Sequence, residues 1–352
     1  MKYLSLFLSV LDKTRFNLAL FLLFLTLISA NSYNAFLHYN FPISQDGRDY
    51  FEMARGNYNV EKIHRYRAII PLTVELISIP ISKVYKHIWP YRAEDAWPLR
   101  FGFFIINTMI MAISSLFLFL ICKSYGTGFF PALITTIMII SCRFTTYFAG
   151  LTLTDSLYYF MIIIMMYGLK KRNAWMISLA IIIGPLSKES FFLFYPLIFF
   201  FGSIGKFKQF MLYVFAILLL GATHYLIDNQ VSHSLYSSVA IAADHLSNIK
   251  YTFSRLFSIK GFFEVFSVLG LNFIVLFMGF LGGKQKINLW LQYVDLPLVI
   301  LFLLILIHMF LSSDIARMLF FAAPFWAVFL ALILEYHPSF LFFSQFTSVT
   351  VK

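Results

Sequence analysis

Long apolar stretches alternate with short polar ones along the whole chain. A helix needs about 20 mostly apolar residues to cross a bilayer, so these stretches are candidate membrane spans. We expect ten spans, at about 16–31, 99–122, 128–144, 155–169, 174–186, 189–204, 209–227, 262–283, 289–311 and 315–335. The segment 174–204 can also be read as one broken hairpin around Pro185, Lys188 and Glu189. The pattern predicts an all-α polytopic membrane protein with one transmembrane domain over residues 1–352.

The longest polar region, residues 32–98, follows the first span and forms the first outer loop in this reading. It contains an apolar run at 68–82, which is too short for a span, carries Glu75 and holds two prolines, Pro71 and Pro80. We therefore expect this run to be a helix that lies along the membrane or dips into it.

Two other polar segments remain. Residues 1–15 are predicted to form an interfacial helix on the cytoplasmic side. Residues 228–260 form a second larger outer loop, expected to pack over a site or contact an acceptor. This loop holds His233, Asp244 and His245, but their spacing is not typical of a metal site.

Composition supports the membrane assignment. Hydrophobic residues make up 60% of the chain and charged residues only 12%, against about 25% in soluble domains. The net charge of +11 comes from lysines and arginines scattered between apolar runs, a pattern that favours anionic lipid over nucleic acid as the partner.

The basic residues also predict an orientation. If 68–82 does not span, most basic residues between spans fall on the side of the N-terminus: Lys13, Arg15, Lys123, Lys170, Lys171, Arg172, Lys206, Lys208, Lys284, Lys286 and Lys352. The positive-inside rule makes this side cytoplasmic. We therefore expect a multi-pass protein of the plasma (inner) membrane, with Asp46, Asp155, Lys188 and Arg317 together on the extracytoplasmic side.

The segment 44–56 concentrates acidic residues just after the first span. If it is helical, the i, i+3, i+4 spacing places Asp46, Asp49 and Tyr50 on one face. A short amphipathic helix at the membrane edge would then present two acids to one side. The rest of the chain is expected to supply the scaffold and the partners of this face.

Other ionisable residues at span ends each have two readings. Asp155 lies at the start of a span, where it is either a helix cap or a second acid of the site. Lys188 and Glu189 either extend their charged ends to the membrane surface, or Lys188 binds a phosphate at the N-terminus of a helix. The remaining basic candidates are structural ion partners, headgroup-facing residues or ligands of a lipid phosphate: Arg317 with its i, i+3 neighbour Asp314, and Arg65 with Arg67.

The order of these features resembles the GT-C superfamily of membrane glycosyltransferases, which use polyprenyl-phosphate-linked sugars. The matching elements are Asp46-x-x-x-Tyr50-x-x-x-Ala54, Arg65-Tyr66-Arg67 before Pro71, Thr152-x-Thr154-Asp155, Lys188-Glu189 and Asp314-x-x-Arg317. They extend over residues 46–317. The sequence departs from the family in lacking an Asp-x-Asp or Asp-Glu pair in the first loop.

The resemblance implies an inverting hexosyl- or pentosyltransferase at the extracytoplasmic face. Asp46 would be the general base, with Asp49 as its rival, and Asp155 would orient the acceptor or hold the Asp46 loop. The donor phosphate would be bound by Lys188, Arg317, Arg65 and Arg67, with support from Asp49, Tyr50, Glu189 and Asp314. The partners would be the lipid-linked sugar, a glycan, lipid or protein acceptor, and membrane lipids. No cofactor is required, although a divalent cation, Mg²⁺ or Mn²⁺, can bind between two acids.

Three other functions fit a membrane protein of this kind: a polymerase or ligase of lipid-linked glycans, a lipid or solute transporter or flippase, and a structural membrane subunit. Transporters often show internal repeats and polar residues at mid-membrane depth. This sequence shows no repeat, and its acids cluster at one predicted face, which favours the glycosyltransferase.

Overall fold

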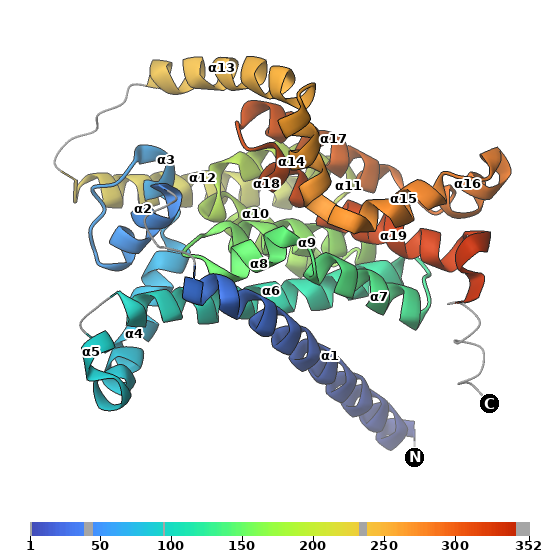
Figure 1. Ribbon diagram of the computed structural model, residues 1–352, viewed down its shortest axis with the longest axis horizontal. Coiled ribbons are helices and arrows are strands. Elements are labelled where there is room, and N and C mark those ends of the chain that lie inside the picture. Colours follow the sequence, from blue (N-terminus) through green and yellow to red (C-terminus); the bar gives the residue numbers. More distant parts are fainter. Residues whose placement is uncertain (1, 39–44, 94–95, 232–237, 343–352) are drawn as a thin grey trace.

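The computed structural model describes residues 2–38, 45–93, 96–231 and 238–342, and every regular element within these ranges is a helix. Most of the long helices run along the longest axis of the molecule and pack side by side (Figure 1). The predicted all-α class is therefore confirmed for the described part of the chain.

The first part of the chain forms α1 (Lys2–His38), α2 (Gln45–Ala54), α3 (Lys62–Arg65), α4 (Ile69–Ile88), α5 (Pro90–Ala93) and α6 (Trp97–Ser124). The expected separate helix at 1–15 is wrong, because α1 continues without a break. No glycine or proline occurs in this helix to interrupt it. The apolar run expected at 68–82 extends to the 20 residues of α4.

The middle of the chain forms α7 (Phe129–Ile140), α8 (Arg143–Gly150), α9 (Asp155–Lys171), α10 (Ala174–Ser187), the 3-10 helix η1 (Glu189–Phe194), α11 (Tyr195–Phe201) and α12 (Lys206–Asp228). The expected break near Lys188 is present. Phe191 packs directly on the backbone of Gly184, so closely that a Cβ atom there would overlap the ring. This close packing fixes the position of Lys188, which lies at the break between α10 and η1.

The last part forms α13 (Ser238–Leu256), α14 (Ile259–Leu269), η2 (Gly270–Asn272), α15 (Phe273–Gly279), α16 (Gly283–Leu291), α17 (Leu296–Leu311), α18 (Ile315–Phe320), α19 (Ala323–Tyr336) and η3 (Pro338–Phe340). The span expected at 289–311 contains a sharp bend, because α16 and α17 meet at 98°. The side chain of Asp295 accepts a hydrogen bond from the Leu298 amide and starts α17 anew.

Four helical segments in the described ranges are long and apolar enough to cross a membrane: Thr14–His38, α6, α12 and Ile259–Gly279. The count rises to six if the bent pairs α7–α8 and α16–α17 each form one span. Helix α4 is not among them. The apolar helices support a multi-pass membrane protein, while the expected number of ten spans is not confirmed.

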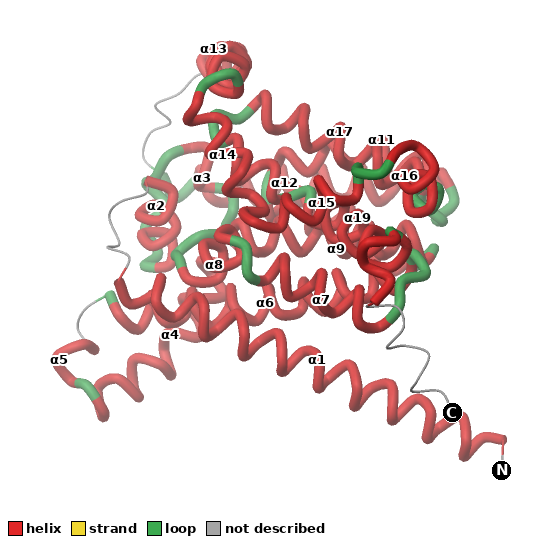
Figure 2. The backbone as a smooth tube through the Cα atoms, turned by 45° about the vertical axis from the view of Figure 1, so that its right-hand side comes forward, coloured by secondary structure: helices red, strands yellow, loops and turns green. Residues whose placement is uncertain are grey.

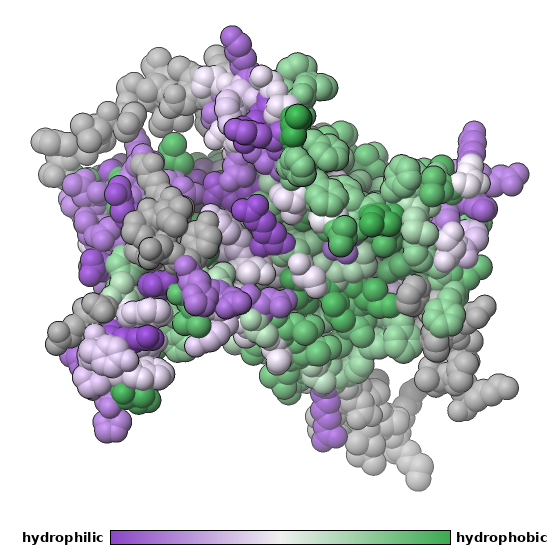
Figure 3. All heavy atoms as spheres, viewed as in Figure 1, coloured by the Kyte–Doolittle hydropathy of each residue, from purple (hydrophilic) through white to green (hydrophobic). Residues whose placement is uncertain are grey.

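The surface is divided along the long axis. Hydrophobic side chains cover the middle of the molecule, and hydrophilic ones gather at the end where α2 and α3 lie (Figure 3). The start of α1 and the end of α19 lie toward the opposite end in both backbone views (Figures 1 and 2). Large apolar side chains such as Phe200, Phe207 and Leu218 are exposed, as expected for a surface that faces lipid.

Candidate active site

Helix α2 turns its acidic face toward the rest of the molecule, as its sequence pattern predicted. The buried positions on this helix include Asp49, Tyr50, Met53 and Ala54. Asp46 is partly exposed and lies in the first helical turn, where unpaired backbone N–H groups favour a negative charge. The segment thus brings two carboxylates to one side.

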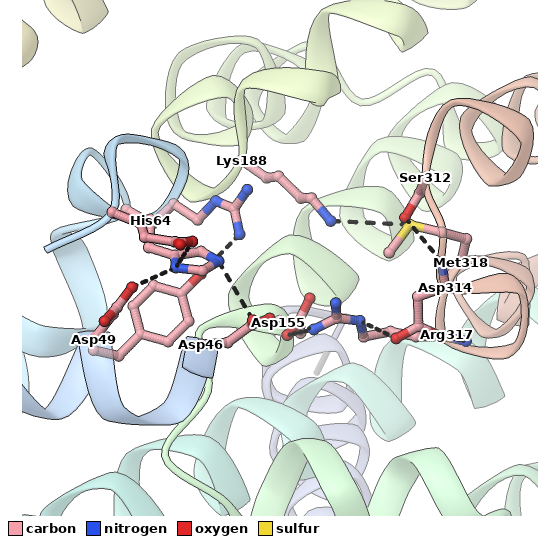
Figure 4. A network of polar contacts seen from close by, with 12 residues as sticks. Asp46, Asp49, His64, Asp155, Lys188, Ser312, Asp314, Arg317 and Met318 are labelled. Carbon is pink, nitrogen blue, oxygen red and sulfur yellow. Dashed lines mark hydrogen bonds and ion pairs between the residues drawn. The ribbon is translucent and has the colours of Figure 1, made fainter. Parts of the chain in front are cut away.

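Arg317 joins three carboxylates that are far apart in the sequence (Figure 4). Its Nη1 lies 2.8 Å from Asp46 Oδ2 and 3.5 Å from Asp155 Oδ2, and its Nε lies 2.9 Å from Asp314 Oδ2. The Asp314 side chain also accepts a hydrogen bond from the Arg317 amide at the start of α18. Three elements, α2, α9 and the start of α18, therefore meet at one guanidinium.

The segment before α9 is held in place by side-chain hydrogen bonds. Thr152 Oγ1 donates to the carbonyl oxygen of Gly47 at 3.1 Å, which ties this segment to α2. Asn107 Nδ2 donates to two backbone carbonyls of the segment at 3.0 Å each. The N-cap of α9 makes no side-chain capping bond. The buried Asp155 carboxylate instead contacts Arg317, which favours a role in the site over a role as a cap.

The environment of Asp46 keeps its carboxylate ionised. Burial raises the pKa of this group, but the positive charge of Arg317 and the neighbouring His64 outweigh burial and lower the pKa to about 2. Asp46 is therefore a carboxylate throughout the neutral range.

His64, on α3, lies between the two acids of α2. Its Nδ1 is 2.8 Å from Asp49 Oδ2, and its Nε2 is 3.4 Å from Asp46 Oδ1 (Figure 4). Both His64 and Asp49 are buried. This histidine belongs to none of the motifs that the sequence suggested.

A candidate metal site overlaps this contact. Ligand atoms of Asp49, Glu61 and His64 all lie within 4.8 Å of one another. Two carboxylates and an imidazole are a donor set that suits a divalent cation such as Mn²⁺ or Zn²⁺. These three residues, rather than a pair of aspartates, are the ones that would hold the expected cation.

Lys188 is a cation without a carboxylate partner in the described part of the chain. Its Nζ lies 3.9 Å from Met318 Sδ and faces the rings of Tyr158 and Phe321 at 5.4 and 5.5 Å. Burial lowers the pKa of Lys188 to about 7, and the nearby positive charge of Arg67 acts in the same direction. An anionic ligand beside this ammonium would supply its missing counter-charge.

The two predicted arginines of the first loop point in different directions. Arg67 Nη1 donates to Tyr50 Oη at 2.7 Å, and its Nε lies 3.8 Å from Glu189 Oε2. Arg65 instead contacts Asp228 Oδ1 at 3.3 Å and the Val60 carbonyl at 2.9 Å. Of these two arginines, Arg67 lines the cavity described next and Arg65 does not. The structure therefore favours a role for Arg65 as a structural ion-pair partner.

A cavity of about 800 Å³ opens beside these groups. Its walls come from α2, α3, the break after α10, η1, α12, α13 and the α17–α18 connection. The ionisable residues that line it are Asp46, Lys62, His64, Tyr66, Arg67, Lys188, Glu189, His224, His308 and Arg317. A volume of this size matches small-molecule sites, and these walls combine an ionised acid with several cations.

Apart from Arg65, the predicted residues fall into two groups around this cavity. Asp46, Arg67, Lys188, Glu189 and Arg317 line it. Asp49, Tyr50, Asp155 and Asp314 do not line it, but each contacts a lining residue.

The segment predicted as a second larger loop, residues 228–260, also reaches the cavity, through α13. Asn248 lines the cavity, and Thr252 Oγ1 donates to the Ser312 carbonyl at 2.8 Å. His233 lies outside the described residues, and the side chains of Asp244 and His245 are not described.

Comparisons with known proteins identify no relative of this chain. No family model, no curated protein and no solved structure matches it.

Proposed function

We propose that this chain is a membrane glycosyltransferase of the GT-C type. It would move a hexosyl or pentosyl unit from a polyprenyl-phosphate donor to an acceptor hydroxyl. The observation that carries the proposal is the meeting of an ionised carboxylate, Asp46, with a lysine that has no ion-pair partner among the described residues, Lys188, in one cavity of a largely apolar helical protein.

The position of the cavity fits a substrate with a polar head and a lipid tail. The cavity walls include α2 and α3, which lie at the hydrophilic end of the molecule next to the hydrophobic middle (Figures 1 and 3). With ten spans and a cytoplasmic N-terminus, this end would face the extracytoplasmic side of the plasma membrane. A lipid-linked sugar would then keep its tail against the apolar helices and its head in the cavity.

Asp46 is suited to act as the general base. It would take the proton of the acceptor hydroxyl while that oxygen attacks the anomeric carbon from the face opposite the phosphate. Attack from the opposite face inverts the configuration of the sugar. Asp155 would hold Arg317, and through it the position of Asp46.

The leaving phosphate needs positive charge more than a proton. Lys188 supplies it directly, because none of the described carboxylates forms an ion pair with its ammonium. Arg317 supplies more as the reaction proceeds, since protonation of Asp46 removes one of its three negative partners. Arg67 also lines the cavity and would contact the donor from the α3 side.

The test is transfer of radiolabelled sugar from polyprenyl-phosphate donors in proteoliposomes, with native membrane extract as the source of acceptor. Asp46→Asn should reduce transfer by at least about 100-fold, the usual contribution of a general base. Glu52→Gln is the matched control, because Glu52 lies on the same helix and pairs with the exposed Arg55. Equal transfer by the wild type and Asp46→Asn would contradict the proposal.

A further inference from the structure

A second cavity, of about 330 Å³, lies among the helices of the C-terminal part of the chain. The described residues that line it are all hydrophobic: Leu256, Val265, Val268, Phe273, Phe302, Leu306, Met309, Phe310, Leu319 and Trp326. The indole N–H of Trp326 donates to the Leu319 carbonyl at 3.0 Å, so it is not directed at a ligand. The cavity therefore suits a hydrocarbon, because a polar ligand would find no hydrogen-bond partner on these walls.

Helices α13 and α18 form walls of both this apolar cavity and the polar cavity of the candidate active site. On α13, Asn248 lines the polar cavity and Leu256 lines the apolar one, and both share one helix face with Thr252 because the spacing is four residues. A rise of about 1.5 Å per residue places Asn248 and Leu256 about 12 Å apart. On α18, Arg317 and Leu319 line the polar and the apolar cavity in the same way. The two cavities are therefore neighbours.

Hydrogen bonds between α13 and the α17–α18 connection lie where the two cavities meet. Thr252 Oγ1 donates to the Ser312 carbonyl at 2.8 Å, and Asn248 Nδ2 donates to the Leu311 carbonyl at 3.4 Å. Hydrogen bonds between neutral groups contribute little net free energy, so these contacts can open when a chain passes between the helices.

The apolar cavity also borders on the surface that faces lipid. Its α14–α15 wall belongs to Ile259–Gly279, a segment long and apolar enough to cross a membrane. The rings of Phe262 and Phe263 on this segment are exposed, as expected for contact with lipid. A hydrocarbon chain can therefore reach the cavity from the bilayer without crossing water.

We propose that the apolar cavity binds the isoprene units of the donor that lie next to its phosphate, while the phosphate itself lies at Lys188 and Arg317. This inference rests on the proposed glycosyl transfer. A ligand that fills both cavities needs an anionic head joined directly to a hydrocarbon chain, and a polyprenyl phosphate has this structure. A phospholipid carries glycerol ester groups between its phosphate and its chains, and apolar walls would leave these groups without hydrogen-bond partners.

The experiment measures the Kd of farnesyl phosphate, with three isoprene units, and of dimethylallyl phosphate, with one, for protein in nanodiscs after subtraction of binding to empty nanodiscs. Val265→Trp fills the apolar cavity and should weaken farnesyl phosphate binding at least about 10-fold, because overpacking a site displaces its occupant. It should leave the Kd of dimethylallyl phosphate within about twofold. Lys188→Gln removes the contact with the phosphate and should weaken both probes. Val299→Trp, at an exposed position of α17, is the matched control and should change neither.

Photo-crosslinking of the wild type decides the matter should Val265→Trp not fold. Farnesyl phosphate with a diazirine on its last isoprene unit should label residues within 256–273 or 302–326. Labels confined to the apolar helices α6 and α12 would place the chain elsewhere and reject the site.

The binding results separate this inference from the proposed function. An equal Kd of farnesyl phosphate in Val265→Trp and Val299→Trp would mean that a bilayer acyl chain, rather than the donor, fills the cavity. An equal loss of both probes in Val265→Trp would mean that the substitution disturbs the polar cavity. Sugar transfer together with either result keeps the function and rejects the isoprenoid site. The expected binding pattern without transfer from any donor keeps the isoprenoid site and rejects the function.

Discussion

Replacing Arg317 by methionine should destabilise the protein more than the same replacement of an exposed arginine. The guanidinium is the shared partner of Asp46, Asp155 and Asp314, at 2.8, 3.5 and 2.9 Å. Methionine fills a similar volume but leaves three carboxylates without this cation.

The cost comes mainly from one of the three acids. The side chains of Asp46 and Asp314 are 23% and 42% exposed, so water can solvate them, but that of Asp155 is only 4% exposed. Breaking a buried ion pair costs about 3–5 kcal/mol, while exposed pairs contribute about 0–1 kcal/mol. Since Arg67 adds some positive charge near Asp155, we expect about 3 kcal/mol for Arg317→Met.

Cys122 and Cys142 provide the assay, because both are buried and free. A thiol-reactive dye followed across an SDS titration in mixed micelles reports the free energy of unfolding. The double variant Asp155→Asn/Arg317→Met also removes the buried charge that Arg317→Met leaves unpaired. It should recover about 2 kcal/mol of the lost free energy of unfolding. Arg143→Met, at an exposed site, should stay within about 0.5 kcal/mol of the wild type. The reasoning is refuted if Arg317→Met matches that control, or if the double variant is no more stable than the single one.

Three further predictions concern donor binding and packing. Donor affinity should weaken as pH rises from 6 to 9, because the Lys188 ammonium, whose pKa is lowered to about 7, loses its proton in this range. In a titration of donor binding, Lys188→Arg should make the affinity less dependent on pH. Gly184→Ala should cost about 1–3 kcal/mol in the SDS titration, since its Cβ would overlap Phe191, and wild-type stability would show that the break can widen freely. Arg65→Met should lower stability through its lost contact with Asp228 yet leave the donor KM within twofold, and a tenfold rise in KM would return Arg65 to the binding site.

Much of the candidate site could be predicted from local patterns. The 3.6-residue period of α2 fixed which side of the helix carries Asp46 and Asp49, and the structure buries that side. The expected common sidedness of Asp46, Asp155 and Arg317 agrees with their contacts. These predictions succeeded because they depend on helix geometry and on the cost of placing a charge in an apolar surrounding.

Other features depend on tertiary contacts that no local pattern encodes. Arg65 ends the short helix α3 and Arg67 follows it, so a difference of two residues sends one to Asp228 and the other to the cavity. His64 occurs in no motif, and only its contacts with Asp46 and Asp49 single it out.

The bend between α16 and α17 was also not predicted. Asp295 caps a new helix and binds Lys170 and Tyr125. The partners of that carboxylate come from segments more than 100 residues away, which explains why hydropathy alone suggested a single span without a bend.

The most direct test of the central claim is release of free polyprenyl phosphate from a lipid-linked sugar by the purified protein, measured by mass spectrometry with membrane extract as acceptor. We expect release by the wild type that depends on Asp46 and falls to background in Asp46→Asn. Release that is equal in the two proteins, or absent with every polyprenyl-phosphate sugar supplied, would contradict it.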